Sequence, residues 1–454
     1  MSAVRKQIVN KFRVLSVAAI LLGFISVSAQ IIQPPQFPSY KKYLDNISGM
    51  TVDEIVAHAL EHNAELIGMR KEEAAGEALI RQARLRPNPS ITVSGAREIG
   101  GMGDNSLMVQ GDLPLELGGR RSARIRIAEH EHMIHGQATA EMERRIAGEA
   151  RTKFGEALAA ALKLKFTEEM LTVATENFEL VAAQVNEGRR PPLERNMEAV
   201  ELNRIRALRE ITEGSVEMRM LELRNLAGMS PEEPLLIRGD FEGLLGSAPP
   251  ESIATDQALQ RRPDLGGARA VEMLAEARIE QARAEGRFDA DVMLGYQRMR
   301  TGFPLLGVEA STGALLPIES KLNYFTFGVK LNLPLRNRNQ GTIAAAKLEA
   351  EAARSRREFG ELTVKREVAS AYARYNRALR AKEIYRVGVR EQAAANLAVV
   401  RQTYDLGSKT LLDYIAEQRR YIDTESGYID AQLEAYQSRV EILRAVNAPQ
   451  LTNK

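Results

Sequence analysis

Five histidines are the residues of this sequence best suited to bind a metal ion or transfer a proton. His58 and His62 are four residues apart, and His130, His132 and His135 share one short segment. A spacing of four on a helix places two imidazoles on one face, where they can chelate a cation. However, no third ligand of fixed position is evident, and His130 and His132 point to different sides of a helix. We therefore expect solvated surface histidines and predict no metal site.

Residue patterns typical of catalysis are missing from the sequence. It contains neither a Gly-x-Ser-x-Gly motif nor a P-loop, and the Gly-rich run at 100–103 lies between two predicted strands, as a hairpin loop does. The absence of cysteine excludes disulfides, thiolate metal sites and a lipidated N-terminal Cys. We predict that the protein is not an enzyme and needs no cofactor.

Charge and the N-terminal segment indicate an exported protein. The 454 residues include 62 Lys and Arg against 60 Asp and Glu, a balance too even for a nucleic-acid binder. An apolar run spans 14–27, and Val27-Ser28-Ala29 fits the small-residue cleavage rule, so residues 1–29 are predicted to be a signal peptide. The alternative is a membrane anchor, but the run is short for a span. Four basic residues precede the run: Arg5, Lys6, Lys11 and Arg13.

The sequence repeats itself, in three blocks that keep the same order. Ala59–Val93 aligns with Ala258–Val292 at an offset of 199, and Leu113-Pro114-Leu115 aligns with Leu333-Pro334-Leu335 at 220. The Gly188 region then aligns with the Gly407 region at 219. Chance similarity among Ala-, Arg- and Glu-rich helices is the alternative. The change in offset predicts a longer loop between the two strands of the second half. The predicted organisation is a signal peptide (1–29), a first repeat (30–227), a linker (228–250), a second repeat (251–446) and a tail (447–454).

Helical patterns dominate both halves. Thr51 and Glu54 form a predicted capping box for a helix that continues to about Arg86, and its counterpart covers 252–286. A nearly unbroken helix is predicted over Gly119–Gly188, about 105 Å at 1.5 Å per residue. The helix that returns beside it, 193–226, is half as long, so the helix at 51–86 can stack end to end with this shorter helix. In the second half the long helix 342–406 is expected to have the same two partners, 411–446 and 252–286. Helices this polar are wet on both sides, as in a tube wall, whereas an ordinary coiled-coil rod is the alternative.

Alternating apolar and polar residues predict four strands. Strands of about 9–11 residues with an apolar outer face are typical of a transmembrane β-barrel, and a soluble sheet with one wet face is the alternative. Because open edges cannot exist in lipid and small barrels need about 8 strands, one chain cannot close a barrel, and at least two chains must contribute. The apolar positions are Ile91, Val93, Leu107, Val109, Leu113, Leu115, Val292, Leu294, Tyr296, Phe325, Phe327, Val329, Leu331 and Leu333.

These residues together resemble the TolC-like outer membrane efflux proteins, along essentially the whole mature chain. The segment Arg261-Arg262-Pro263-Asp264-Leu265 is similar to the family's signature, although the lipidated Cys of some members is missing. Three segments are similar to cation-efflux members of the CzcC type: Arg86–Pro89, Pro114–Arg124 and Pro192–Glu194. The resemblance implies an α+β fold, with a homotrimeric outer-membrane barrel of twelve strands continued by a helical periplasmic tunnel. It also implies two partners, a periplasmic adaptor and an inner-membrane pump of the resistance-nodulation-division class.

The two helical turns farthest from the predicted strands receive the functional prediction, because the family has its periplasmic gate and adaptor contact there. By position, the gate residues are Tyr404, Lys409, Asp413 and, in the first repeat, Glu194. We expect Glu194 to reach Tyr404, and Lys409 and Asp413 to share one helix face. Helix capping and solvated charge are the alternative for these residues. The predicted adaptor contacts are Gly188, Arg189, Arg190, Leu406, Gly407 and Ser408.

The predicted function is a passive outer membrane channel of a tripartite efflux system, exporting heavy-metal cations. The alternatives are a general drug channel, a secreted coiled-coil adhesin or toxin, and a closed scaffold that only binds an adaptor.

Arg120 and Arg121 begin a long helix, where basic residues oppose the helix dipole. Arg336 and Arg338 occupy the corresponding region of the second repeat. Contact with headgroups of outer membrane lipids is one predicted role of these arginines, and simple solvation is the other.

Overall fold

The computed structural model describes residues 38–99 and 104–452. The predicted signal peptide and the Gly-rich run at 100–103 lie outside these residues. The chain divides into a unit Met1–Ser39 and a unit Tyr40–Lys454, and the description below concerns the second unit. None of the helices in the described part combines the length and the hydropathy of a membrane-spanning helix.

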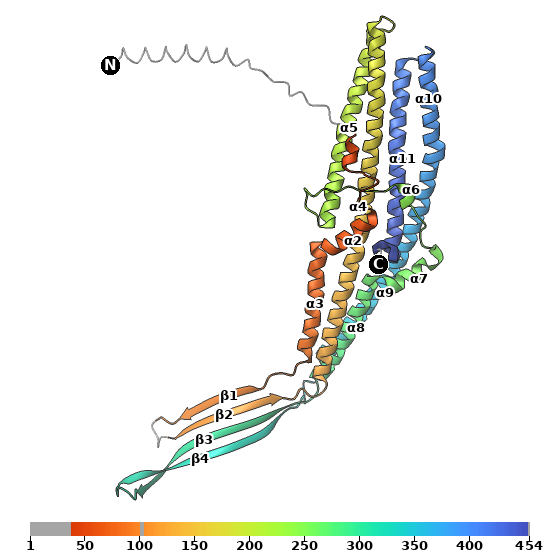
Figure 1. Ribbon diagram of the computed structural model, residues 1–454. Coiled ribbons are helices and arrows are strands. Elements are labelled where there is room, and N and C mark those ends of the chain that lie inside the picture. Colours follow the sequence, from red (N-terminus) through yellow and green to blue (C-terminus); the bar gives the residue numbers. More distant parts are fainter. Residues whose placement is uncertain (1–37, 100–103, 453–454) are drawn as a thin grey trace, which may run out of the picture. The chain divides into compact units, whose positions relative to one another are not determined.

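In the first half, helices precede and follow a pair of strands along the chain, and the strands lie at one end of the helices (Figure 1). The predicted capping box exists: the Thr51 backbone N–H donates to Glu54 Oε2 (2.7 Å), and the Glu54 N–H donates to Thr51 Oγ1 (3.3 Å). The predicted single helix is nevertheless broken at Asn63, whose side chain caps the next helix by accepting from the Leu66 N–H at 3.1 Å. The elements are η1 (Ser39–Lys42), α2 (Val52–His62), α3 (Ala64–Arg84), β1 (Ser90–Arg97), β2 (Asn105–Pro114), α4 (Arg120–Asn186) and α5 (Pro192–Ala227).

The second half has the same order of elements, with one added irregularity. Its first helix is broken at Arg262, and its long helix contains a π-helical stretch, η2 (Ile384–Arg390), where one continuous α-helix was predicted. The elements are α6 (Phe241–Leu244), α7 (Glu251–Arg261), α8 (Pro263–Glu285), β3 (Asp289–Val308), β4 (Leu315–Asn332), α9 (Gln340–Glu383), η2, α10 (Glu391–Asp405), α11 (Leu411–Val446) and α12 (Pro449–Thr452).

Corresponding parts of the two halves make the same contacts. The breaks at Asn63 and Arg262 are 199 positions apart, and α11 begins and ends 219 positions after α5. Arg70 donates to the Leu60 carbonyl at 2.9 Å, and Arg269 donates to the Leu259 carbonyl at 2.8 Å, again at the offset of 199. The similarity between the halves therefore extends from sequence to individual hydrogen bonds.

The four strands form one antiparallel sheet in the order β1-β2-β3-β4. One row of register partners, Val93, Val109, Tyr296 and Phe325, crosses all four strands on the same face. The neighbouring row on this face runs from Ile91 through Gly111 and Leu294 to Phe327, which is 87% exposed. This face is apolar from these rows to the strand end at Leu331, whereas its next row toward the hairpin ends carries Arg298 and Asn323. Within the described residues β1 and β4 each have one unpaired edge.

The prediction for the second strand pair was wrong in two respects. β3 and β4 have 20 and 18 residues, about twice the predicted length, and the connection between them, 309–314, is short. The additional residues therefore extend the strands, and the predicted longer loop is absent. In this part of the strands, adjacent apolar residues and two prolines interrupt the alternation of apolar and polar residues, so the sequence pattern does not show a strand. The pairing register of β3 and β4 shifts between Phe303 and Leu306, as at a β-bulge.

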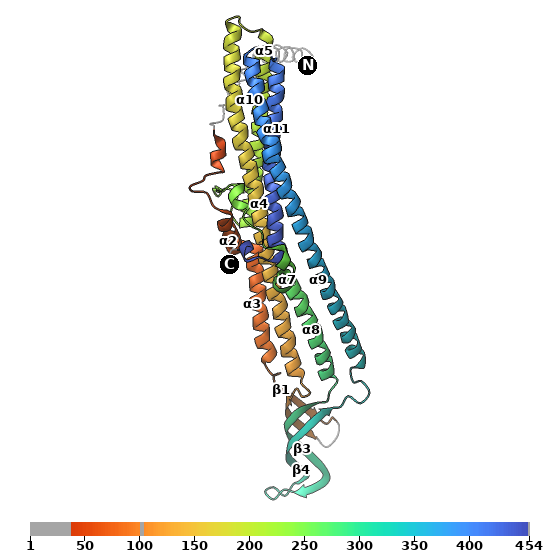
Figure 2. The same ribbon diagram turned by 90° about the vertical axis from the view of Figure 1, so that its right-hand side faces the viewer.

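The long helices pack side by side as predicted. α4 contacts α5 along one part of its length and α3 along another, and α9 contacts α8 and α11 (Figure 2). The core lies at mid-length of α4, where small residues let the helices approach. A Cβ on Gly155 would lie 2.6 Å from the ring of Tyr436, which is buried together with Phe154. Within the second unit, this packing puts the sheet at one end and the turns α4–α5 and α10–α11 at the other (Figure 1).

Candidate functional site

The two helical turns opposite the sheet have the same backbone structure. Gly188 and Gly407 have φ values of 72° and 76°, and this left-handed conformation favours glycine. The N–H that follows each glycine closes a wide turn: Arg189 donates to the Gln184 carbonyl and Ser408 to the Thr403 carbonyl, both at 2.9 Å. This pattern is the Schellman C-cap, which ends a helix by satisfying its last carbonyls.

Glu194 and Tyr404 meet at these turns, as predicted. The Tyr404 hydroxyl on α10 donates to Glu194 Oε2 on α5 at 3.3 Å. Arg190 completes a three-residue cluster, because its guanidinium pairs with Glu194 at 2.8 Å, bonds the Tyr404 hydroxyl and lies 4.5 Å from the centre of the Tyr404 ring. We call Arg190, Glu194 and Tyr404 the tip cluster. The sequence predicts Arg190 only as an adaptor contact, and its place in the tip cluster emerges from the structure.

The predicted pair of Lys409 and Asp413 on one helix face was wrong. α11 begins at Leu411 with Thr410 as its N-cap, so Lys409 precedes the helix. Asp413 instead closes a capping box, in which its carboxylate accepts from the Thr410 N–H at 3.0 Å and its own N–H donates to Thr410 Oγ1 at 3.2 Å. The hydrogen bonds from Thr410, first from its side chain, lower the pKa of Asp413. Asp413 therefore fits the capping alternative.

A small cavity of about 70 Å³ lies behind the tip cluster, between the two helical hairpins. Tyr404 stacks on Tyr414, with ring centres 5.8 Å apart, and Asn177 of α4 donates to the Tyr414 hydroxyl at 3.0 Å. Glu198, one helical turn after Glu194, also lines the cavity and is 2% exposed. Burial, followed by the charges of Glu201 and Glu194, raises the pKa of Glu198 to about 7. The spacing of four between Glu194 and Glu198 places both carboxylates on one face of α5, so the sequence alone could have predicted that Glu198 lies near the cluster.

The remaining tip residues are exposed. The Arg189 side chain is 75% exposed and pairs only with the nearby Glu187 (3.1 Å) among the described residues, and Leu406 projects its apolar side chain into solvent. Around Gly188 and Gly407 a Cβ would meet no atom within 4 Å. These residues are accessible to a partner, and their role in adaptor contact stays a prediction.

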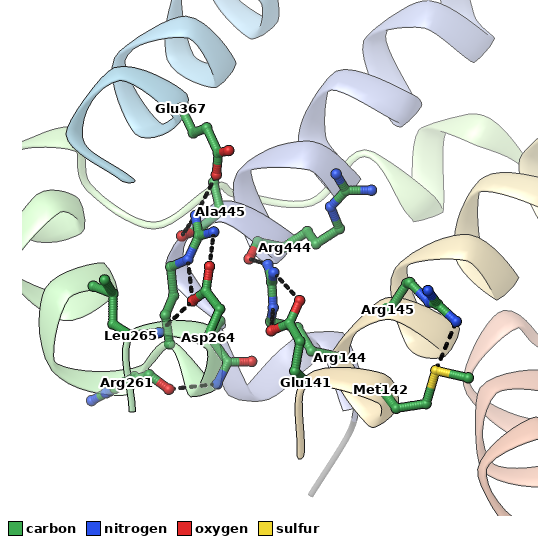
Figure 3. A network of polar contacts seen from close by, with 12 residues as sticks. Glu141, Met142, Arg144, Arg145, Arg261, Asp264, Leu265, Glu367, Arg444 and Ala445 are labelled. Atoms are coloured by element: carbon green, nitrogen blue, oxygen red, sulfur yellow. Dashed lines mark hydrogen bonds and ion pairs between the residues drawn. The ribbon is translucent and has the colours of Figure 1, made fainter. Parts of the chain in front are cut away.

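The Arg261–Leu265 segment lies at the break between α7 and α8. The Arg262 guanidinium donates to both carboxylate oxygens of Asp264, at 3.0 and 2.6 Å, and to Glu367 of α9 at 2.6 Å (Figure 3). Burial would raise the pKa of Asp264, but its hydrogen bond and charge interaction with Arg262 outweigh this and lower it. Pro263 occupies the first position of α8, and Leu265 is buried in the core. Through the Arg262–Glu367 contact, the segment connects the break between α7 and α8 to α9.

The histidines differ in part from the prediction. His58 and His62 are stacked with ring centres 4.1 Å apart, and their Nδ1 atoms lie 3.0 and 3.1 Å from the carbonyls of Ala227 and His58. His130 and His132 are half-buried, and their Nδ1 atoms are shielded without a partner among the described residues, so they are not fully solvated. The described residues contain no group of three potential ligands placed to hold a metal ion.

Arg120 and Arg121 act as caps of neighbouring helices. Arg120 pairs with Asp289 at 3.0 Å and donates to the Glu285 carbonyl at the end of α8. Arg121 donates to the Arg84 carbonyl at the end of α3, at 3.0 and 2.7 Å. Basic groups at helix C-termini complement the dipole, so these contacts offset the unfavourable position at the start of α4 without lipid.

Comparison with known proteins identifies the family. A family model described as outer membrane efflux protein matches residues 55–228 and 254–448. The chain belongs to this family. The cobalt-zinc-cadmium resistance protein CzcC of Cupriavidus metallidurans is 23% identical over 398 residues, covering 87% of this chain and 89% of CzcC. Family membership places the protein in the outer membrane, with a periplasmic extension.

Two solved structures show the same TolC-like fold. CusC superposes with a TM-score of 0.72 at 17% identity, covering 87% of this chain and 91% of CusC. A membrane protein of Pseudomonas aeruginosa superposes with a TM-score of 0.71 at 19% identity, covering 90% of this chain and 94% of its own. The fold is that of outer membrane efflux channels. The family is described by efflux and CzcC by metal resistance, which fits the predicted absence of catalysis.

Proposed function

We propose that three copies of this chain form one outer membrane channel, the exit of a tripartite efflux system. The observation that carries the proposal is the four-stranded sheet, which has an apolar face and two unpaired edges. In lipid every backbone donor and acceptor needs a partner, so the edges must pair with other chains. Three copies would supply twelve strands, an even number within the range of closed membrane barrels.

The helices would continue this barrel into the periplasm as a tunnel, with the turns at Gly188 and Gly407 at its far end. In this proposal 30–227 and 251–446 are two structural repeats joined by 228–250, which the shared offsets of 199 and 219 support. The tip cluster, Lys409 and Asp413 would belong to the gate region, and the exposed turn residues would contact a periplasmic adaptor. An inner-membrane pump of the resistance-nodulation-division class would supply the energy, so transport through the channel itself is passive.

Heavy-metal cations are the proposed substrates. The support is the similarity to the cobalt-zinc-cadmium resistance protein and the Pro114–Arg124 segment. In this segment Glu116, Gly118 and Gly119 have positive φ and build the turn from β2 to α4, and Glu116 pairs with Arg124. The segment therefore supports this proposal only through its similarity to cation-efflux members, since its side chains shape a turn. A general drug channel is the second candidate.

Deletion of the gene tests the substrate. The expected result is increased sensitivity to divalent cobalt, zinc or cadmium, restored by the intact gene. Unchanged metal tolerance together with greater dye or detergent sensitivity would favour the drug channel.

Assembly is tested separately: the protein should be extracted from outer membranes only with detergent, as a trimer. A stable detergent-free monomer, or secreted soluble protein as expected of an adhesin, would contradict the channel. A correctly assembled trimer that conducts no ions after loss of the tip contacts would indicate a scaffold.

A further inference from the structure

A cavity of about 320 Å³, lined largely by arginines, lies beside the break between α7 and α8. The cavity is separate from the tip cluster and shares no residue with it. Four elements of one chain form it: α4, α9, α11 and the start of α8. The deep side is built by two buried arginines, Arg144 (7% exposed) and Arg262 (5% exposed). Its arginines are Arg144, Arg262, Arg366, Arg374 and Arg444, and its acidic residues are Glu367 and Glu441.

The two buried arginines are fully engaged inside the protein. Arg144 donates to Glu141 at 2.7 and 2.5 Å and to the Arg444 carbonyl at 2.6 Å (Figure 3). Arg262 pairs with Asp264 and Glu367 and reaches the Ala445 carbonyl at 3.5 Å. Both therefore cap the last carbonyls of α11, which is a structural role. Because three carboxylates, Glu141, Asp264 and Glu367, neutralise these two guanidiniums, any charge that attracts an anion must come from the outer arginines.

The outer arginines have donors to spare. Arg374 pairs with Glu441 at 3.0 Å, but the guanidiniums of Arg366 and Arg444 have no hydrogen bond or ion pair with any described residue. Arg444 lies across α4 at Gly148, where a Cβ would come within 3.0 Å of its Cδ. Its guanidinium extends away from Arg144 (Figure 3). Together with the carboxylates that they bind, the five arginines face four acidic residues, Glu141, Asp264, Glu367 and Glu441, so one positive charge is in excess.

We propose that this cavity binds a multivalent oxyanion, with Arg366 and Arg444 as the recognising residues. The planar guanidinium matches phosphate and carboxylate oxygens in a two-bonded arrangement, and hydrogen bonds between charged groups are about twice as strong as neutral ones. A bound anion would use the spare donors and offset the repulsion among the arginines. The volume exceeds that of a single phosphate group, since one water occupies about 30 Å³, so inorganic pyrophosphate is a suitable probe.

The test is calorimetric titration of pyrophosphate into the full-length protein, purified in detergent, at constant ionic strength. Saturable binding at one site per chain is expected. The double variant Arg366→Gln with Arg444→Gln should weaken it at least tenfold. The control variant, Arg126→Gln with Arg356→Gln, removes the same charge from exposed arginines of α4 and α9 outside the cavity and should bind like the wild type.

Three results would overturn the proposal. The first is a wild-type protein that shows no saturable binding, as expected if a carboxylate of another chain fills the cavity. The second is a cavity variant that binds pyrophosphate as tightly as the wild type. The third is an equal loss of affinity in the cavity variant and the control variant, which would indicate a general charge effect. Circular dichroism and size-exclusion chromatography of every variant establish that it is folded and assembled like the wild type. The site is contained in one chain, so the outcome does not depend on the transported substrate.

Discussion

The Tyr404 hydroxyl donates a hydrogen bond to the Glu194 carboxylate across the two helical hairpins, over 3.3 Å and 210 positions of sequence. Arg190 contacts both residues, so one guanidinium, one carboxylate and one phenol join α5 to α10. Among the described residues, the hydrogen bond from Asn177 to Tyr414 also links the two hairpins near this end. Any movement that separates the hairpins at this end must break the tip cluster.

The first prediction is that loss of the tip cluster favours an open end. Glu194→Ala combined with Tyr404→Phe removes the carboxylate and the hydroxyl but leaves the turns intact. Each link contributes about 0–1 kcal/mol, and threefold repetition would bring the total to a few kcal/mol. Single-channel conductance in planar bilayers should rise. Lys71→Gln, at an exposed position of α3, should conduct like the wild type, and equal low conductance in all three proteins would exclude a gating role for the tip cluster.

The second prediction concerns pH. The pKa of buried Glu198 is about 7, against an ordinary value of 4.5, so between these values the folded protein holds a proton that the unfolded chain releases. The free energy of unfolding should therefore fall as pH rises from about 4.5 to about 7, by at most about 3 kcal/mol.

Glu198→Gln should remove this decrease, because the amide does not titrate. The measurement is thermal unfolding in detergent at a series of pH values. Glu179→Gln, at an exposed position of α4, serves as the control and should keep the wild-type profile. A Glu198→Gln profile that still parallels the wild type would show that other groups cause the decrease.

The third prediction distinguishes the two faces of the sheet. Phe327 lies on the apolar face, whereas Thr326 shares the opposite face with Lys330. If the apolar face contacts lipid, Phe327→Lys should destabilise the protein by about 2–4 kcal/mol near the bilayer centre and less near its surface. Thr326→Lys should be tolerated. The amount of heat-modifiable trimer in outer membranes measures both, and equal tolerance would argue against lipid contact at Phe327.

The fourth prediction concerns the C-terminal segment, which folds onto α4 as α12. Buried Arg151 donates to the carbonyls of Leu451 and Gln450, at 2.9 and 2.6 Å, and pairs with Asp53 at 2.5 Å. Arg151→Met leaves these acceptors unpaired and should cost about 3 kcal/mol. Arg145→Met removes an exposed pair with Glu65 and a weak hydrogen bond to the Met142 sulfur, and should cost less than about 1 kcal/mol. Thermal unfolding compares the two, and similar losses would contradict the role of Arg151.

Local sequence determined the elements and their order. The capping box at Thr51 and Glu54 needs only residues three apart, and the alternation around Phe325 and Phe327 needs only neighbours, so both were predictable. The break at Arg262 had a local signal that was overlooked, because the residue before a proline is disfavoured in a helix. Family membership also followed from sequence, since its motifs are contiguous segments.

Local sequence did not decide which side chains meet across the hairpins, and only the family resemblance predicted that Glu194 reaches Tyr404. Arg190 and Tyr404 are 214 positions apart, so their contact depends on how two hairpins pack, and no local pattern specifies it. The same holds for Arg366 and Arg444, which share a cavity because α9 and α11 are neighbours. Lys409 and Asp413 show the converse: spacing suggested a pair, but the cap at Thr410 placed the start of the helix between them. Spacing predicts a shared face only where both residues lie within the helix.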